Sequence, residues 1–438
     1  MDIGLYFPLQ LPRPWGPGAE HTLVHEALAQ VELADRLGFT HAWVPEQHFL
    51  EEYSHSSAPE VFLAAAAART RTIRLGHGVV LLPPAYNPPT RIAERLAMLD
   101  LVSDGRVEFG FGDSKSRIEL EGFGIEADQR QAMTAEAIEQ VAAMLALDPY
   151  PGHRGRWFTA PARNVVPKPA QRPHPPLWMA CSSDEAVRTA ARFGVGALAH
   201  GFRDPDEARR VVEIYRRTFT EECRPIGFTV NPRVATLEPF YCHPDPDIAR
   251  RRGGQAMEYM TFAVRHYYTF GRHHPGRTDL SARWDRTRAQ LDTDTDTGTG
   301  AAPVVHGGHS VGTPDQLAAH LTELRDAGVD QVVLSHQAGR TPHAEICASL
   351  ELFADQVLPA LGDGPQPIEI PAHVTEALAR RATTTPAAVE PVDAYGRDRP
   401  PIDPSTFPPD IRAQFEQLNR VAELGKAYDS PDLAGPNS

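Results

Sequence analysis

Two hydrophobic patterns alternate along the first 362 residues of the chain. Short apolar runs of strand length are separated by longer stretches in which apolar residues recur at i, i+3, i+4 and i+7, the spacing of an amphipathic helix. Residues 21–38 and 90–103 are clear examples of the helical stretches. This alternation is typical of repeated βα units.

Eight segments have the pattern expected of strands. They are residues 2–9, 40–45, 73–83, 106–112, 176–181, 196–201, 233–242 and 331–336. Eight βα units of this size predict an α/β protein with a (β/α)8 TIM barrel. A doubly wound open sheet is the alternative, because periodicity alone does not show that a sheet closes. Against it, no GxGxxG motif follows the first strand, and GVGALAHG at residues 194–201 lacks the rest of that dinucleotide-binding fingerprint.

The pattern changes in two places. Residues 271–311 are polar and alternate Asp with Thr, which predicts a long mobile insertion near the seventh strand. Beyond the barrel domain at residues 1–362, the chain is rich in Pro, Thr and Asp, with one helical pattern at residues 410–427. We expect residues 363–438 to form a Pro-rich C-terminal extension that lies on the surface or is partly disordered.

Composition limits the classes of partner. The chain has 438 residues, of which 41% are hydrophobic, enough for one large core with an appendage. Its formal net charge of −14 argues against binding to nucleic acid or to anionic lipid. The four cysteines lie far apart, without metal-ligand or disulfide-framework spacing, so we expect reduced thiols and no metal site. The chain starts without a leader pattern and has no membrane-length apolar run, so we expect a soluble, cytoplasmic protein.

Candidate chemistry lies where the predicted strands end. Glu46, Gln47 and His48 directly follow the second strand, and in a TIM barrel the loops at the carboxyl ends of the strands build the active site. Groups that donate and accept protons at such a mouth indicate acid–base chemistry. A solvated loop with an incidental histidine is the alternative.

Two other strand ends favour ligand binding. The fourth strand ends with Gly110 and Gly112, which allow close approach of the backbone to a ligand. The fifth ends with Cys181, Ser182 and Ser183, followed by a helix whose first turn can offer free N–H groups to a phosphate. An ordinary N-cap is the alternative for the serines, and the two uses are compatible.

Together these segments resemble the bacterial luciferase-like flavin-dependent monooxygenases. The likeness is carried, in the order of that family, by DIGLYFPLQ, GFTHAWVPEQHF, IRLGHGVVLLPPAYNPPTRIAERLAMLDLVSDGRVEFGFG, PLWMACSS and SVGTPDQLAAHLTELRDAGVDQVVL. The third of these is the most specific. The resemblance implies a (β/α)8 barrel that uses reduced FMN and O2 to oxygenate a small organic substrate through a flavin C4a-peroxide or hydroperoxide. It also implies a homodimer, and a separate flavin reductase is a partner to consider.

The resemblance assigns roles near the second strand. The family's Glu-His-His motif corresponds here to Glu46, Gln47 and His48, so an amide replaces the middle histidine. An amide cannot act as a general base at neutral pH, but it can hydrogen-bond a peroxide or the flavin edge. Proton transfer would then depend on His48 or on His200, which ends the sixth strand and which we expect in the substrate pocket. A satisfied histidine at a strand end is the alternative for His200.

The resemblance also places the cofactor. A peptide at the end of the third strand, often cis and beneath the isoalloxazine, corresponds to Gly78 and Val79. The phosphate pocket corresponds to Asp113, Arg130 and the run from Cys181 through Ser182 to Ser183. Asp113 departs from the family, in which a basic residue is frequent at this position, and a carboxylate beside a phosphate dianion is unfavourable. Lys115, Arg117 and Arg130 are the nearby residues that could restore positive charge.

A reactive flavin adduct needs apolar walls and a cover that excludes water, so the insertion at 271–311 is a candidate lid. A tolerated surface insertion without a catalytic part is the alternative. Three functions remain open at this point. They are an FMN-dependent monooxygenase, a deazaflavin-dependent hydride-transfer enzyme of the same superfamily, and a non-catalytic flavin-binding protein.

Overall fold

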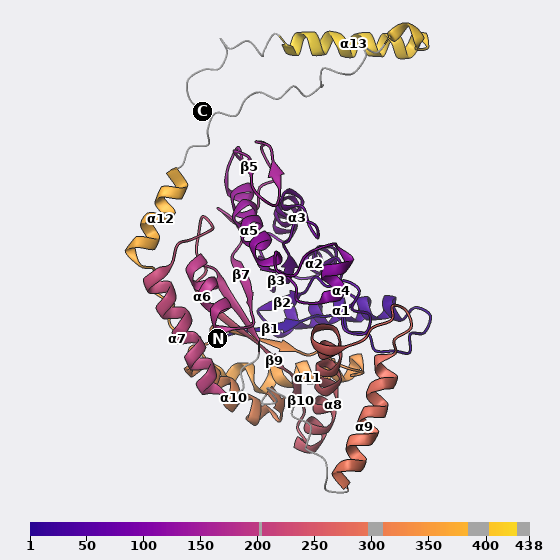
Figure 1. Ribbon diagram of the computed structural model, residues 1–438, viewed down its shortest axis with the longest axis vertical. Helices are drawn as coiled ribbons and strands as arrows, with labels where there is room; N and C mark the ends of the chain where they lie inside the picture. The colour runs from indigo at the N-terminus through magenta and orange to yellow at the C-terminus, as the bar shows by residue number, and fades with distance from the viewer. Residues whose placement is uncertain (201–203, 297–309, 384–402, 427–438) are drawn as a thin grey trace. The chain divides into compact units, whose positions relative to one another are not determined.

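Eight parallel strands close into a barrel in the order β1-β12-β9-β8-β7-β4-β3-β2 (Figure 1). The strands are β1 (Asp2–Tyr6), β2 (His41–Val44), β3 (Arg74–Leu81), β4 (Val107–Gly112), β7 (Leu177–Cys181), β8 (Gly196–His200), β9 (Val234–Pro239) and β12 (Gln331–Ser335). Each lies within one of the eight predicted segments. The predicted TIM barrel is therefore confirmed, and the open sheet is excluded.

Helices follow the strands along the chain, and one of them, α8, lies at the mouth of the barrel. They are α1 (Ala19–Leu37), α2 (Pro59–Ala67), α3 (Pro89–Val102), α4 (Arg117–Gly122), α5 (Arg130–Ala146), α6 (Asp184–Phe193), α7 (Pro205–Glu222), α8 (Pro246–Arg265), α9 (Leu280–Asp296), α10 (Pro314–Asp326) and α11 (His343–Gln356). Two small sheets pair β5 (His153–Arg154) with β6 (Thr159–Ala160) and β10 (Tyr241–Cys242) with β11 (Val311–Gly312). A π-helical segment, η1 (His266–Phe270), continues α8, and a 3-10 turn, η3 (Leu358–Ala360), follows α11.

This computed structural model describes residues 1–200, 204–296, 310–383 and 403–426. The chain divides into two units, residues 1–389 and 390–438. The first unit includes α12 (Ala372–Thr383), beyond the residue 362 at which the sequence places the end of the barrel domain. Val374 of α12 is fully buried in the hydrophobic core, and Arg381 forms a 2.8 Å ion pair with Glu139 of α5.

The second unit contains the helix that the sequence predicts at residues 410–427. It is α13 (Pro409–Lys426), preceded by a 3-10 turn, η4 (Pro404–Thr406). The Arg412 guanidinium donates to the carbonyl oxygens of Ser405 and Phe407, and the Phe407 ring contacts the Phe415 ring. The turn and the helix therefore stabilise each other locally.

Two tryptophans fill the inside of the barrel. Trp43 of β2 and Trp178 of β7 are almost completely buried, and their rings meet edge to face with centroids 5.7 Å apart. Each fits because a glycine stands on the neighbouring strand: a Cβ at Gly76 would lie 2.3 Å from the Trp43 ring, and one at Gly196 would lie 2.3 Å from the Trp178 ring. The barrel is thus packed with side chains beneath its mouth.

The predicted insertion contains a helix that the sequence pattern did not predict. Helix α9 begins at Leu280, whose side chain is fully buried although most of the segment is polar. The buried Glu52 carboxylate holds the start of this helix, because it accepts hydrogen bonds from the backbone N–H groups of Leu280 and Ser281 and from the Tyr259 hydroxyl of α8. Residues 297–309, where the expectation of mobility also falls, lie outside the described residues.

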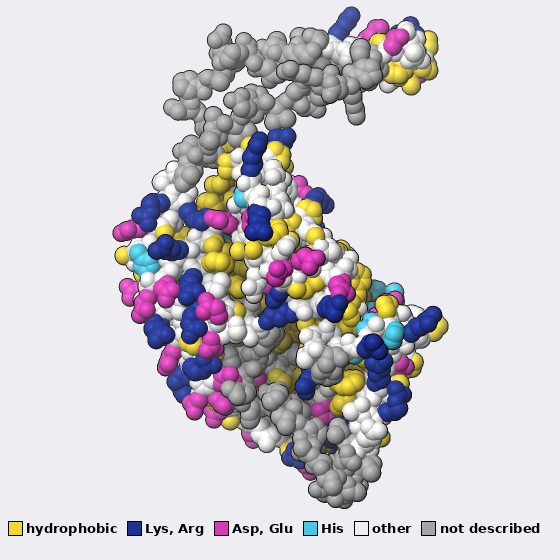
Figure 2. Space-filling view, in the orientation of Figure 1, with side chains coloured by type: hydrophobic (Ala, Val, Ile, Leu, Met, Phe, Trp, Pro, Cys, Tyr) yellow, Lys and Arg dark blue, Asp and Glu magenta, His cyan; other side chains and the backbone are white. Residues whose placement is uncertain are grey.

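Charge on the surface is mixed in sign. Figure 2 shows Lys and Arg side chains interspersed with Asp and Glu over the face in view.

Within the described parts of the chain, no helix combines the length and the apolar character that crossing a bilayer requires.

Candidate active site

A cavity of about 560 Å³ opens at the carboxyl ends of the barrel strands. Every one of the eight barrel strands contributes to its wall, together with α8, η1 and the loops after β2 and β4. Trp43 forms part of its floor. Most of the wall is apolar, as in Met257, Met260 and Val264 along the α8 side. The cavity lies where the sequence places the active site.

The loop after β2 brings Glu46 and Gln47 to the cavity but turns His48 away from it. The buried Glu46 carboxylate accepts hydrogen bonds from the Leu81 backbone N–H at 2.9 Å and from the Asn87 amide at 2.7 Å, which joins the loops after β2 and β3. His48 lies behind Glu46, with its Nε2 3.1 Å from Glu46 Oε1 and its ring edge-on to Phe123. The structure therefore brings Glu46 and His48 together, although only Glu46 lines the cavity.

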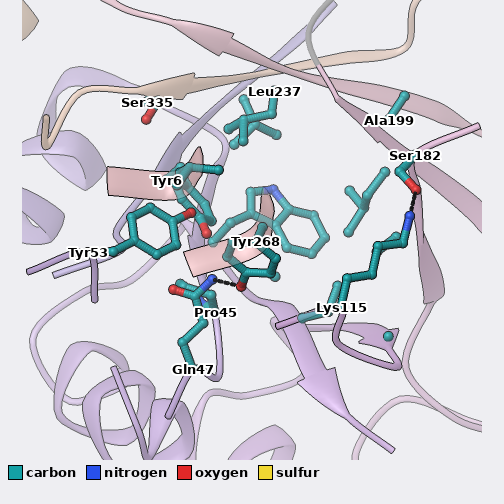
Figure 3. Close-up of a pocket in the computed structure, with 18 of the residues that line it drawn as sticks. Tyr6, Pro45, Gln47, Tyr53, Lys115, Ser182, Ala199, Leu237, Tyr268 and Ser335 are labelled. Carbon is teal, nitrogen blue, oxygen red and sulfur yellow. Dashed lines mark hydrogen bonds between the residues drawn. The ribbon is translucent and has the colours of Figure 1, made fainter. Parts of the chain in front are cut away.

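Gln47 lies within a group of tyrosines. Its Nε2 donates to the Tyr268 hydroxyl at 3.2 Å, and its Oε1 is buried with no hydrogen-bond partner in the described structure. Tyr6 and Tyr53 line the cavity beside it (Figure 3). Sequence reasoning missed all three tyrosines. Tyr6 lies inside the predicted segment 2–9 and ends the strand only in the structure, and Tyr268 lies on a π-helical turn that no sequence pattern marked.

The Gly78–Val79 peptide, which the sequence places at the flavin, lies in the cavity wall at the end of β3. The Gly78–Val79 bond is a cis peptide, and both residues line the cavity. The register between β3 and β4 shifts between His77 and Val80. Gly110 makes room for this irregularity, since a Cβ there would lie 2.2 Å from the His77 carbonyl oxygen. The expectation that Gly110 admits a ligand is therefore wrong, because this glycine accommodates the neighbouring strand.

The predicted phosphate residues divide into two groups. Ser182 lines the cavity, and its hydroxyl contacts the Lys115 ammonium group from the loop after β4 (Figure 3). Cys181 points the opposite way, into the core between strand and helices, as alternation along a strand requires. Burial raises the pKa of the Cys181 thiol to about 12. Ser183 caps α6, accepting a hydrogen bond from the Ala186 N–H.

Asp113 and Arg130 pair with each other. Arg130 Nε lies 3.2 Å from Asp113 Oδ2, and only Asp113 lines the cavity. Burial raises the pKa of Asp113, whereas the charges of Arg130 and Lys115 act to lower it. Arg117 is exposed and pairs with Glu121. Lys115 is therefore the one Lys or Arg among the described residues that line the cavity.

Glu119 of α4 is a buried carboxyl in the wall that sequence reasoning also missed. It accepts hydrogen bonds from the Ser114 hydroxyl at 2.5 Å and from the His48 backbone N–H at 2.8 Å. Burial raises its pKa, which these hydrogen bonds only partly offset. His200 is the last residue of β8, but the prediction that its side chain lines the pocket falls outside the described part of the chain.

Comparison with known proteins gives a family match. The sequence model of a family described as luciferase-like monooxygenase matches residues 1–331. The chain is 26% identical over 354 residues to uncharacterized protein y4vJ of Sinorhizobium fredii, which covers 78% of this chain and 92% of the relative.

Relatives with named activities match over shorter stretches. Identity is 31% over 193 residues with limonene 1,2-monooxygenase of Rhodococcus erythropolis, which covers 44% of this chain and 49% of the relative. The chain is 27% identical over 223 residues to the oxygenase component of flavin-dependent trigonelline monooxygenase of Acinetobacter baylyi. This match covers 50% of this chain and 59% of the relative. The chain thus spans about half the length of these two relatives.

Solved structures share the fold. Monooxygenase RslO1 from Streptomyces bottropensis is 29% identical, with a TM-score of 0.66 over 83% of this chain and all of that one. The oxygenating constituent of 3,6-diketocamphane monooxygenase from Pseudomonas putida, solved with FMN, has a TM-score of 0.63 at 20% identity, covering 82% and 98%. An F420-dependent secondary alcohol dehydrogenase has a TM-score of 0.60 at 18% identity, covering 83% and 99%. At such identities the last two show the fold alone.

Proposed function

The chain belongs to the luciferase-like monooxygenase family, and from this premise we propose that it binds reduced FMN at the barrel mouth and uses O2 to oxygenate a small organic substrate. Membership makes it an enzyme of the oxidoreductase class. The observation that carries the choice of FMN is the contact between Lys115 and Ser182 at one end of the cavity. A cation, a hydroxyl and the start of α6 together suit a phosphate group.

The residues present fit a flavin mononucleotide. The cavity volume lies within the range of small-molecule and cofactor sites. The Gly78–Val79 peptide and the Trp43 ring offer a flat apolar surface for a ring system. The unpartnered Oε1 of Gln47 can accept a hydrogen bond from a flavin ring N–H, which would satisfy a buried polar atom. Pairing with Arg130 offsets the negative charge of Asp113 near the phosphate.

When bound, reduced FMN would supply oxygen activation at its C4a atom. The chain's own contribution would be to hold the ring, through Gln47, and to exclude water with the apolar side chains of α8. Glu46 and His48 would hold a proton between them at the cavity wall, so His48 would act through Glu46 and not by touching the flavin. Lys115 and Ser182 would make the main contact with the phosphate, a role that the sequence analysis gave to Arg130.

A separate flavin reductase would supply the reduced flavin. This part of the proposal is supported by the trigonelline relative, which is named as an oxygenase component.

The test is to add the protein to reduced FMN in aerated buffer and to follow flavin reoxidation and the release of hydrogen peroxide. Binding with slowed release of peroxide is the expected result. FMN that is bound but oxidised as fast as free FMN would favour the non-catalytic alternative. Failure to bind FMN, together with binding of a reduced deazaflavin, would favour the hydride-transfer alternative.

A further inference from the structure

Three tyrosines gather at the end of the cavity that lies opposite Lys115 (Figure 3). Tyr6 ends β1, Tyr53 lies on the loop after β2, and Tyr268 belongs to η1, so three separate elements bring their hydroxyl groups together. We call these three residues the tyrosine cluster. A π-helical turn such as η1 often occurs at functional sites.

The hydroxyl groups of the cluster are hydrogen-bond donors and not bases. Burial raises the pKa of Tyr6 and of Tyr268 well above the ordinary value of 10, and it raises the pKa of Tyr53 as well. The negative charge of the Glu119 carboxyl group also raises the pKa of each of the three tyrosines. The phenols therefore keep their protons at neutral pH.

The hydrogen bonds seen within the cluster do not use all of its protons. Gln47 Nε2 donates to the Tyr268 oxygen, so this bond does not use the Tyr268 proton. The Tyr6 and Tyr53 hydroxyls point toward one another (Figure 3), and such a pair uses only one of its two protons internally. Buried donors are nearly always paired, so an acceptor atom of a ligand fits here.

Charge around the cluster selects the kind of acceptor. The Glu119 carboxyl acts electrostatically on all three tyrosines and on Glu46, so both carboxyls lie near the cluster, whereas Lys115, the one Lys or Arg among the described lining residues, lies away from Tyr6 and Tyr53 (Figure 3). A carboxylate or phosphate on the substrate would meet repulsion without a counter-charge. A neutral oxygen does not, and the neighbouring Met257, Met260 and Val264 suit an apolar body.

We propose, resting on the function proposed above, that the tyrosine cluster binds the carbonyl oxygen of a neutral and largely apolar ketone. Tyr268 donates one hydrogen bond to that oxygen, and the pair formed by Tyr6 and Tyr53 donates a second. The cluster thereby orients the substrate and sets its chemical class, while the flavin occupies the Lys115 end of the cavity.

The test compares two probes of the same shape, 2-adamantanone and 2-methyleneadamantane, in which C=CH2 replaces C=O. Their affinities are measured by calorimetry on protein loaded with oxidised FMN. Tyr268→Phe should weaken ketone binding about five-fold, the loss expected for one neutral hydrogen bond, and should leave the hydrocarbon within two-fold. The carbonyl 13C resonance of labelled ketone should also move toward its value in apolar solvent.

Tyr241→Phe is the matched control. Tyr241 is a buried tyrosine on β10 whose hydroxyl bonds Glu345 and which does not line the cavity, so the affinity of neither probe should change. Equal losses for both probes in Tyr268→Phe would overturn the inference, because they would show a steric effect. So would the absence of ketone binding to FMN-loaded protein. Failure of FMN itself to bind would instead refute the proposed function and, with it, this inference.

Discussion

Replacement of Lys115 should weaken the binding of FMN and leave the binding of riboflavin unchanged. Lys115 contacts Ser182 at the phosphate end of the proposed flavin site, and riboflavin lacks the phosphate. A hydrogen bond to a charged group contributes about 1.5–3 kcal/mol when shielded from water. The Lys115 side chain is exposed, and exposed ion pairs contribute about 0.2–1 kcal/mol. Between these limits we expect about 1–2 kcal/mol, or roughly 5- to 30-fold in Kd.

The assay is a titration of oxidised FMN and of riboflavin, followed by the quenching of flavin fluorescence, for the wild type and for Lys115→Met. Added salt should reduce the advantage of FMN in the wild type and have less effect in the variant. Arg117→Met is the control, because Arg117 is an exposed cation two residues away that pairs with Glu121 outside the cavity. If Lys115→Met keeps the wild-type ratio of FMN to riboflavin affinity, the phosphate does not bind where we place it.

Three further outcomes concern His48, Glu52 and His174. His48→Ala should lower turnover at least ten-fold, roughly the loss of one positioned proton-transfer group, while FMN affinity stays within two-fold; unchanged kinetics would remove His48 from the site. Glu52→Gln should lower the free energy of unfolding by about 2–4 kcal/mol and speed hydrogen exchange at the start of α9, measured against Glu51→Gln, whose more exposed carboxyl should cost less. Burial lowers the pKa of His174 to about 4, so its contribution to stability is present above the ordinary pKa of 6.5 and is lost, by up to about 3 kcal/mol, as pH falls toward 4. Urea denaturation from pH 7.5 to 4.5, roughly that window, should show a shallower decline in His174→Asn; an unchanged slope would contradict this.

The barrel could be predicted because its signal is local. Each strand is a short apolar run bounded by a polar or glycine-containing loop, and the intervening helices repeat at 3.6 residues. Helix α9 could not be predicted in the same way, because few of its residues are apolar. Its start is fixed instead by Glu52, more than 200 positions away in the sequence, through bonds to Leu280 and Ser281.

The sequence could predict only those residues of the candidate site that lie at or directly after the end of a strand. Glu46, Gln47, Gly78 and Ser182 reach the cavity because residues at strand ends face the barrel mouth. Which side chains point into the cavity depends on the alternation along each strand as the structure places it. For this reason Cys181 was assigned to the cavity, although its side chain points into the core between strand and helices.

The tyrosine cluster could not be found from the sequence. Tyr6 and Tyr268 are separated by 262 positions, counted from their numbers, and only the closure of the barrel brings them together. Arg130 was expected to meet a phosphate, but its ion pair with Asp113 depends on a loop conformation that no local pattern encodes.

The packing of Trp43 against Gly76 restricts how this protein can evolve. An added methyl group at Gly76 would overlap the indole ring, and the same holds for Gly196 and Trp178. A larger residue at either glycine is therefore acceptable only after its tryptophan has become smaller, whereas the smaller residue can arise first at the cost of a void. The order of the two substitutions matters, so the interior beneath the mouth changes by coupled steps.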